Sequence, residues 1–102
     1  MSRAKLVNDG AGSYRVEGVL DAASVPELLR ESAARFAGAG AELYVDLGSV
    51  TESDSAGLAL LIEWLRLARG RKQKLHFDNV PQQLRALARI SEVEDLIDGR
   101  SS

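Results

Sequence analysis

Ser55, which follows Asp54, is the residue of this sequence whose type and position best suit a chemical role. The pair comes after an apolar run that predicts a strand and before an amphipathic segment that predicts a helix over residues 55–69. If Asp54 caps that helix, the Ser55 hydroxyl lies in the first helical turn, near the positive end of the helix dipole. An exposed hydroxyl at that place suits protein docking or covalent modification. Alternatively, Ser55 serves only as an ordinary helix-start serine.

Small and polar residues surround Ser55. Ser53 is a second candidate for the helix cap, because its hydroxyl could accept a hydrogen bond from a free backbone N–H group. Ala56 and Gly57 have almost no side chain, so another surface could approach the backbone closely. We therefore predict that Ser55 binds a partner or is modified. Its neighbours form the supporting loop: Ser53, Asp54, Ala56 and Gly57.

Catalytic chemistry is not predicted for this chain. Ser55, His76 and an aspartate could supply the groups of a hydrolytic triad, but the sequence has no G-x-S-x-G elbow and no evident oxyanion loop. The lack of cysteine and the single histidine argue against a zinc site. The glycines within residues 10–12 and 38–40 are not followed by the Lys-Ser/Thr of a phosphate-binding loop. We therefore expect no catalytic residue, no bound metal and no cofactor.

Length and composition indicate one globular domain. With 102 residues, of which 45% are hydrophobic and 27% charged, the chain can bury one core without a metal or a disulfide. We expect the domain to cover residues 1–98 and residues 99–102 to form a flexible tail. The net charge of −2 argues against nucleic-acid binding. No apolar run approaches the roughly 18 residues of a membrane span and the N-terminus does not resemble a signal peptide, so we expect a cytoplasmic protein.

Strand and helix patterns alternate along the chain. The predicted order is strands 4–7 and 13–20, helix 25–37, strand 43–47, helix 55–69, strand 75–77 and a helix after Pro81. Turn residues between the first two strands predict a hairpin, and Ser24 with Glu27 has the spacing of a capping box. This order predicts an α/β fold. We expect a single domain with a mixed β-sheet of four to five strands and about three to four helices packed on it.

The predicted helix over residues 55–69 has more apolar surface than a single contact with a sheet requires. One apolar arc consists of Leu58, Leu61, Ile62, Leu65 and Ala68. A second ridge, roughly 130° away at about 100° per residue, consists of Leu60, Trp64 and Leu67. Either the helix is buried between the sheet and a neighbouring helix, or one arc faces another protein. Because tryptophan is enriched at interface hot spots, we predict the second ridge as a partner-binding surface.

Three blocks of the sequence resemble the STAS domains, a family named after sulfate transporters and anti-sigma factor antagonists. The blocks are residues 18–21, 45–58 and 80–90, and the middle block is the most specific. In anti-sigma factor antagonists, the hydroxyl residue after the loop aspartate is phosphorylated by a partner kinase, which breaks their complex. Ser55 falls on that position, where a phosphate would add about −1.5 to −2 charge.

The run over residues 57–61, followed by Trp64 and a helix end rich in alanine and arginine, resembles the MlaB branch of the family. Members of this branch are small cytoplasmic subunits of the ABC transporter that moves phospholipid to maintain outer-membrane lipid asymmetry. The resemblance implies that Ser55 and the adjoining helix bind the transporter's ATPase subunit and support its activity, without catalysis by this chain.

We therefore expect an ATPase-binding subunit that lies at the inner membrane only through its complex. An exposed apolar ridge suits a permanent contact with an ATPase better than a reversible contact with a kinase. The alternative is an anti-sigma factor antagonist that is regulated by phosphorylation of Ser55 and binds an anti-sigma kinase.

Overall fold

The first two strands form the antiparallel hairpin that the turn residues predict. In the computed structural model, which describes residues 4–97, strand β1 covers Ala4–Gly10 and strand β2 covers Ser13–Leu20. Ala4 lies opposite Gly18 and Leu6 lies opposite Val16. The predicted tail at residues 99–102 lies outside the described part of the chain.

Two helical crossovers add two parallel strands to this hairpin. Helix α1 (Val25–Ala37) leads to β3 (Glu42–Ser53), which runs parallel to β2, and helix α2 (Ser55–Gly70) leads to β4 (Lys74–Asp78), which runs parallel to β3. Within residues 4–97 the sheet has four strands in the order β1-β2-β3-β4. Helices α3 (Gln82–Ile90) and α4 (Glu94–Ile97) follow. The predicted α/β domain with a mixed sheet is therefore confirmed.

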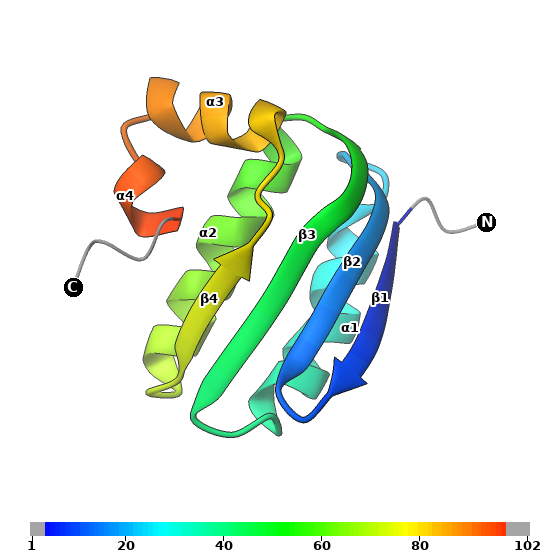
Figure 1. Ribbon diagram of the computed structural model, residues 1–102, viewed down its shortest axis with the longest axis vertical. Helices are drawn as coiled ribbons and strands as arrows, with labels where there is room; N and C mark the ends of the chain where they lie inside the picture. Colours follow the sequence, from blue (N-terminus) through cyan, green and yellow to red (C-terminus); the bar gives the residue numbers. More distant parts are fainter. Residues whose placement is uncertain (1–3, 98–102) are drawn as a thin grey trace.

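The helices α1 and α2 cover the same face of the sheet. Figure 1 shows both behind the strands, with α3 across the end where β3 stops. The connections from β2 to β3 and from β3 to β4 both move one strand toward the same edge of the sheet. Because crossovers between parallel strands have the same handedness, both helices lie on one side of the sheet. Alternate residues of the central strands point toward these helices and are buried, among them Val16, Leu43, Val45 and Leu47. None of the helices in residues 4–97 has the length and apolar character needed to cross a membrane.

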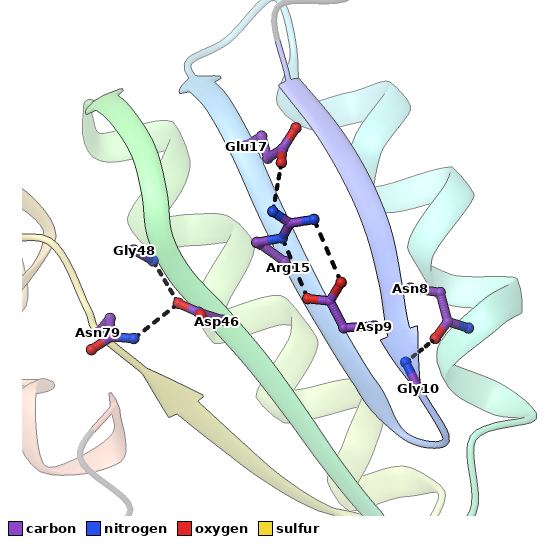
Figure 2. Close-up of polar contacts among 8 residues, drawn as sticks. All are labelled: Asn8, Asp9, Gly10, Arg15, Glu17, Asp46, Gly48 and Asn79. Carbon is purple, nitrogen blue, oxygen red and sulfur yellow. Dashed lines mark hydrogen bonds and ion pairs between the residues drawn. The ribbon is translucent and has the colours of Figure 1, made fainter.

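The opposite face of the sheet has no helix over it in Figure 1 and is largely polar. Figure 2 shows Arg15 between Asp9 and Glu17, with its Nη1 atom 2.9 Å from Glu17 Oε2. Nearby, the Tyr44 ring stacks on the His76 ring at a centroid distance of 4.8 Å. The charged groups of this face are therefore partly neutralised within the molecule.

The predicted partner-binding ridge is largely part of the core. Leu60 and Trp64 are 1% and 2% exposed, and Leu67 is half-buried. The Trp64 ring packs against Phe36 of α1 at a centroid distance of 5.3 Å. The prediction of an exposed ridge is therefore wrong for Leu60 and Trp64. The reason is that α2 lies between the sheet, α1 and the C-terminal helices, so both of its apolar arcs find partners within the molecule.

The start of α1 also differs from the prediction. Ser24 makes no side-chain hydrogen bond to the first turn of the helix, so it does not form a capping box with Glu27. Its hydroxyl instead donates to the Val19 carbonyl at 2.7 Å, while Asp21 Oδ1 accepts from the backbone N–H groups of Ala23 and Ser24. The aspartate thus organises the turn between β2 and α1, in a side-chain-to-backbone arrangement common for this residue type.

Candidate functional site

Asp54 connects the end of β3 to the start of α2. Its backbone is extended (φ −121°, ψ −163°), and its Oδ1 atom accepts a hydrogen bond of 2.8 Å from the Ala56 N–H group. Its own N–H group donates to the Leu20 carbonyl at 3.1 Å, which joins the junction to the end of β2. Asp54 is therefore the helix cap, as one of the two sequence alternatives predicted, and it fixes the direction in which α2 begins.

Ser53 lies in the supporting loop but is not the cap. Its backbone N–H group donates to Gln83 Oε1 at 3.2 Å, and its hydroxyl donates to the Asp54 carbonyl at 3.3 Å. Gln83 belongs to α3, thirty residues further along the chain. No local pattern in the sequence could have indicated that this glutamine positions the loop.

Asn79 connects the segment between β4 and α3 to β3. Its side-chain Nδ2 donates to Asp46 Oδ1 at 3.1 Å, and Asp46 Oδ1 also accepts from the Gly48 N–H group at 2.8 Å (Figure 2). Asn79 lies just before α3, so this contact holds the segment from which Gln83 reaches Ser53.

Gly57 is required by packing inside the molecule. A Cβ atom at this position would lie 2.1 Å from Ser53 Oγ, 3.1 Å from Leu20 Cβ and 3.3 Å from Leu84 Cδ2. Gly57 is buried and Ala56 is half-buried. The expectation that the Gly57 backbone is open to another protein is therefore wrong, because the loop, β2 and α3 already fill that space.

Ser55 is exposed as the first residue of α2. Its hydroxyl makes no hydrogen bond with any residue of the described range 4–97. The hydroxyl therefore lies at the positive end of the helix dipole and is accessible to a partner or to a modifying enzyme.

The solvent-facing side of α2 extends from Ser55 along the helix. The exposed residues recur at helical spacing and define what we term the exposed α2 face: Ser55, Ala59, Ile62 and Arg66. Ile62 is 36% exposed, although the sequence placed it on an apolar arc. Arg66 binds Glu63 of the preceding turn, and its guanidinium holds the pKa of that carboxyl below its usual range.

The structure does not assemble a hydrolytic triad at Ser55. The nearest partners of His76 are Glu42, whose Oε1 atom is 3.0 Å from His76 Nε2, and the Tyr44 ring. Both lie near the start of β3, whereas Ser55 follows its end, roughly 30 Å away at about 3.3 Å per residue. No group of three or more His, Asp or Glu side chains within residues 4–97 could hold a metal ion.

Comparisons with known proteins agree with this fold. Residues 8–98 match the family model described as "Mlab, STAS domain". The anti-sigma-B factor antagonist of Bacillus subtilis (strain 168) is 29% identical over 91 residues, which cover 89% of this chain and 83% of that protein.

A solved structure has the same fold. The structure of the anti-sigma factor antagonist SpoIIAA in its unphosphorylated form superposes with a TM-score of 0.70 at 17% sequence identity, and the match covers 89% of this chain and 82% of that chain. Since the family model spans nearly the whole described domain, the chain belongs to the STAS domain family.

Proposed function

We propose that this STAS domain is a non-catalytic subunit that binds the ATPase of an ABC transporter and supports its activity. The transporter would be the one that moves phospholipid to maintain outer-membrane lipid asymmetry. The observation that carries the proposal is the accessible Ser55 hydroxyl, on a helix start that Asp54 caps, in a chain that matches a family model described as Mlab.

The exposed α2 face supplies the chemistry of a protein contact. The Ser55 hydroxyl and the small Ala59 side chain permit close approach, and Ile62 offers apolar surface in place of the buried Trp64. Interface cores favour such apolar side chains, whereas the Glu63–Arg66 pair suits the polar rim.

The loop before Ser55 is already ordered by contacts within the domain. Asp54 caps α2, Gln83 holds the Ser53 backbone, and Gly57 lets the loop pack against the helix. A preorganised surface loses little conformational entropy on binding, which raises affinity without additional contact area. A subunit without catalytic groups can support an ATPase by binding one conformation of it more tightly than another.

The second candidate function is an anti-sigma factor antagonist controlled by phosphorylation. The observation that favours it is the 29% identity with the anti-sigma-B factor antagonist over 91 residues. A phosphate on Ser55 would lie at a helix N-terminus, which stabilises negative charge, so the fold would persist. The added charge of about −2 would nevertheless change the docking surface beside Asp54 and would weaken an apolar or anionic contact.

Affinity purification from the source cells tests both candidates. We expect the wild-type domain to co-purify with the ATPase subunit of an ABC transporter, Ser55→Ala to retain some of it, and Ser55→Glu to lose it. Recovery of a kinase in place of the ATPase, together with phosphate on Ser55 by mass spectrometry, would favour the second candidate. Recovery of the ATPase in equal amounts with the wild type and both variants would show that Ser55 is not part of the contact.

A further inference from the structure

A group of cations lies at the end of the domain opposite Ser55. Arg69 is in the last turn of α2, Lys72 is in the turn that follows, and Lys74 is the first residue of β4. All three are exposed, and none forms an ion pair with a carboxylate of residues 4–97. We call these three residues the basic end. Figure 1 shows the end of α2 and the start of β4 at the pole of the molecule away from α3.

The turn that carries Lys72 is held in place by side chains. Arg71 Nη2 donates to the Ala33 carbonyl at 3.1 Å. Gln73 Nε2 donates to the Phe36 and Gly40 carbonyls at 2.7 Å and 2.8 Å. These bonds join the turn to the end of α1 and to the segment after it, so they fix the position of the turn that carries Lys72.

Charge is segregated along this part of the chain. No aspartate or glutamate occurs between Glu63 and Asp78, although the chain as a whole has a net charge of −2. A cation in the last turn of a helix interacts favourably with the helix dipole, which explains the position of Arg69 in the last turn of α2. The dipole does not account for Lys72 and Lys74, which come after the helix has ended.

The surroundings of the basic end favour one kind of anionic partner. The exposed large hydrophobic residues within residues 4–97 are Tyr44, Ile62 and Ile90, none of which belongs to the basic end, so it lacks the apolar centre of a protein interface. Glu42 lies opposite Lys74 in the sheet, where its Oε1 atom is 3.0 Å from His76 Nε2, and the adjoining open face also carries Asp46 and Asp78. These carboxylates would repel a nucleic-acid backbone lying along that face. A flat membrane surface that lies across this pole of the molecule (Figure 1) would contact the basic end first.

We infer that the basic end binds the phosphate headgroups of an anionic lipid surface. The inference does not depend on which protein binds Ser55. The two sites lie at opposite ends of α2, about 24 Å apart for 16 residues at ~1.5 Å each, so both can be occupied together. Each cation near an anionic membrane strengthens binding about fivefold, so three cations give a weak, salt-sensitive association. The association becomes substantial when a second contact raises the effective concentration.

Sedimentation with lipid vesicles tests the inference on the isolated domain. We expect the wild-type protein to bind vesicles that contain phosphatidylglycerol and not to bind phosphatidylcholine vesicles. At about 1 M salt, where charges are screened beyond roughly 3 Å, we expect it to bind neither kind of vesicle. The variant Arg69→Gln/Lys72→Gln should bind anionic vesicles about 25-fold more weakly. The control variant Lys5→Gln/Arg89→Gln removes the same charge from β1 and α3 and should bind nearly as the wild type does.

Two outcomes would overturn the inference. One is that wild-type protein fails to bind anionic vesicles at low salt, or that both double variants bind them equally. The other is that Arg69→Gln/Lys72→Gln keeps vesicle binding but loses its protein partner, which would make the basic end a contact for an acidic protein. Circular dichroism and thermal unfolding of each variant exclude a loss of fold as the cause. Failure of the Ser55 contact would leave the vesicle result unchanged, so the two proposals are tested separately.

Discussion

The indole Nε1 of Trp64 donates a hydrogen bond of 2.7 Å to the hydroxyl oxygen of Ser32, across the contact between α2 and α1. Ser32 is fully buried, and its hydroxyl in turn donates to the Leu29 carbonyl at 3.0 Å. The one polar atom of the indole is therefore satisfied within the molecule, while its rings contact Phe36 and Phe77. Trp64 holds α2 against α1 and leaves the opposite side of α2 to the solvent.

Replacing Ser32 by alanine should destabilise the domain without affecting partner binding. The change leaves the Trp64 N–H group buried without an acceptor, which costs about 1–3 kcal/mol. Urea unfolding measures this loss. Ser91→Ala, at an exposed position after α3, is the matched control and should be nearly neutral. Equal stability of both variants would mean that Ser32 does not accept the indole hydrogen bond.

Replacing Trp64 by alanine should damage the core. Removing a buried aromatic side chain costs about 3–5 kcal/mol, which is a large part of the stability of a small domain. Ile62→Ala, on the exposed α2 face, should lower the free energy of unfolding by clearly less than Trp64→Ala does, because Ile62 is 36% exposed and has less buried apolar surface to lose. Thermal unfolding compares the two variants. A Trp64→Ala protein as stable as the wild type would show that the ring is not packed as described.

Replacing Gly57 by alanine should destabilise the helix, although alanine is the better helix former by about 1 kcal/mol. The new methyl group would overlap Ser53 Oγ, and such overpacking costs about 1–3 kcal/mol. Gly70→Ala is the control, because a Cβ there meets no atom within 4 Å. In a double-mutant cycle, Ser53→Ala should recover part of the loss. A Gly57→Ala protein more stable than the wild type would contradict the packing of the loop.

Replacing Gln83 by alanine should weaken partner binding several-fold with little loss of stability. The change removes the acceptor for the Ser53 N–H group, a bond of about 0.5–1.5 kcal/mol, and loosens the loop that presents Ser55. Gln82→Ala, at the adjacent exposed position, is the control. Calorimetric titration with the partner measures both affinities. If the two variants bind equally well, the contact between Gln83 and Ser53 does not position the site.

Local signals predicted most of the elements. The turn residues after β1 predicted the hairpin, and the apolar periodicity predicted α1 and α2 close to their observed bounds. Strand β3 is longer than its predicted core at residues 43–47, because it continues to Ser53. The pairing of β2 with β3 shifts register twice, near Val16 and after Gly18, which interrupts the alternation that marks a strand in a sequence.

Contacts between distant segments could not be predicted. Periodicity places Leu60 and Trp64 on one side of a helix, but it does not say whether another helix covers that side. Ser32 and Phe36 supply part of this cover. Both belong to α1, which strand β3 separates from α2 in the sequence. Likewise, the contact between Ser53 and Gln83 joins residues whose local patterns are independent of each other.

The most direct test of the partner-binding surface compares two isoleucines of the same chain. Ile62 lies on the exposed α2 face, whereas Ile90 is 80% exposed on α3. We expect Ile62→Asp to weaken binding of the purified ATPase partner about 30-fold or more, as expected for a charge introduced at an interface hot spot. Ile90→Asp should bind as the wild type does. Unchanged affinity of Ile62→Asp, or an equal loss with Ile90→Asp, would contradict the assignment of the contact to the exposed α2 face.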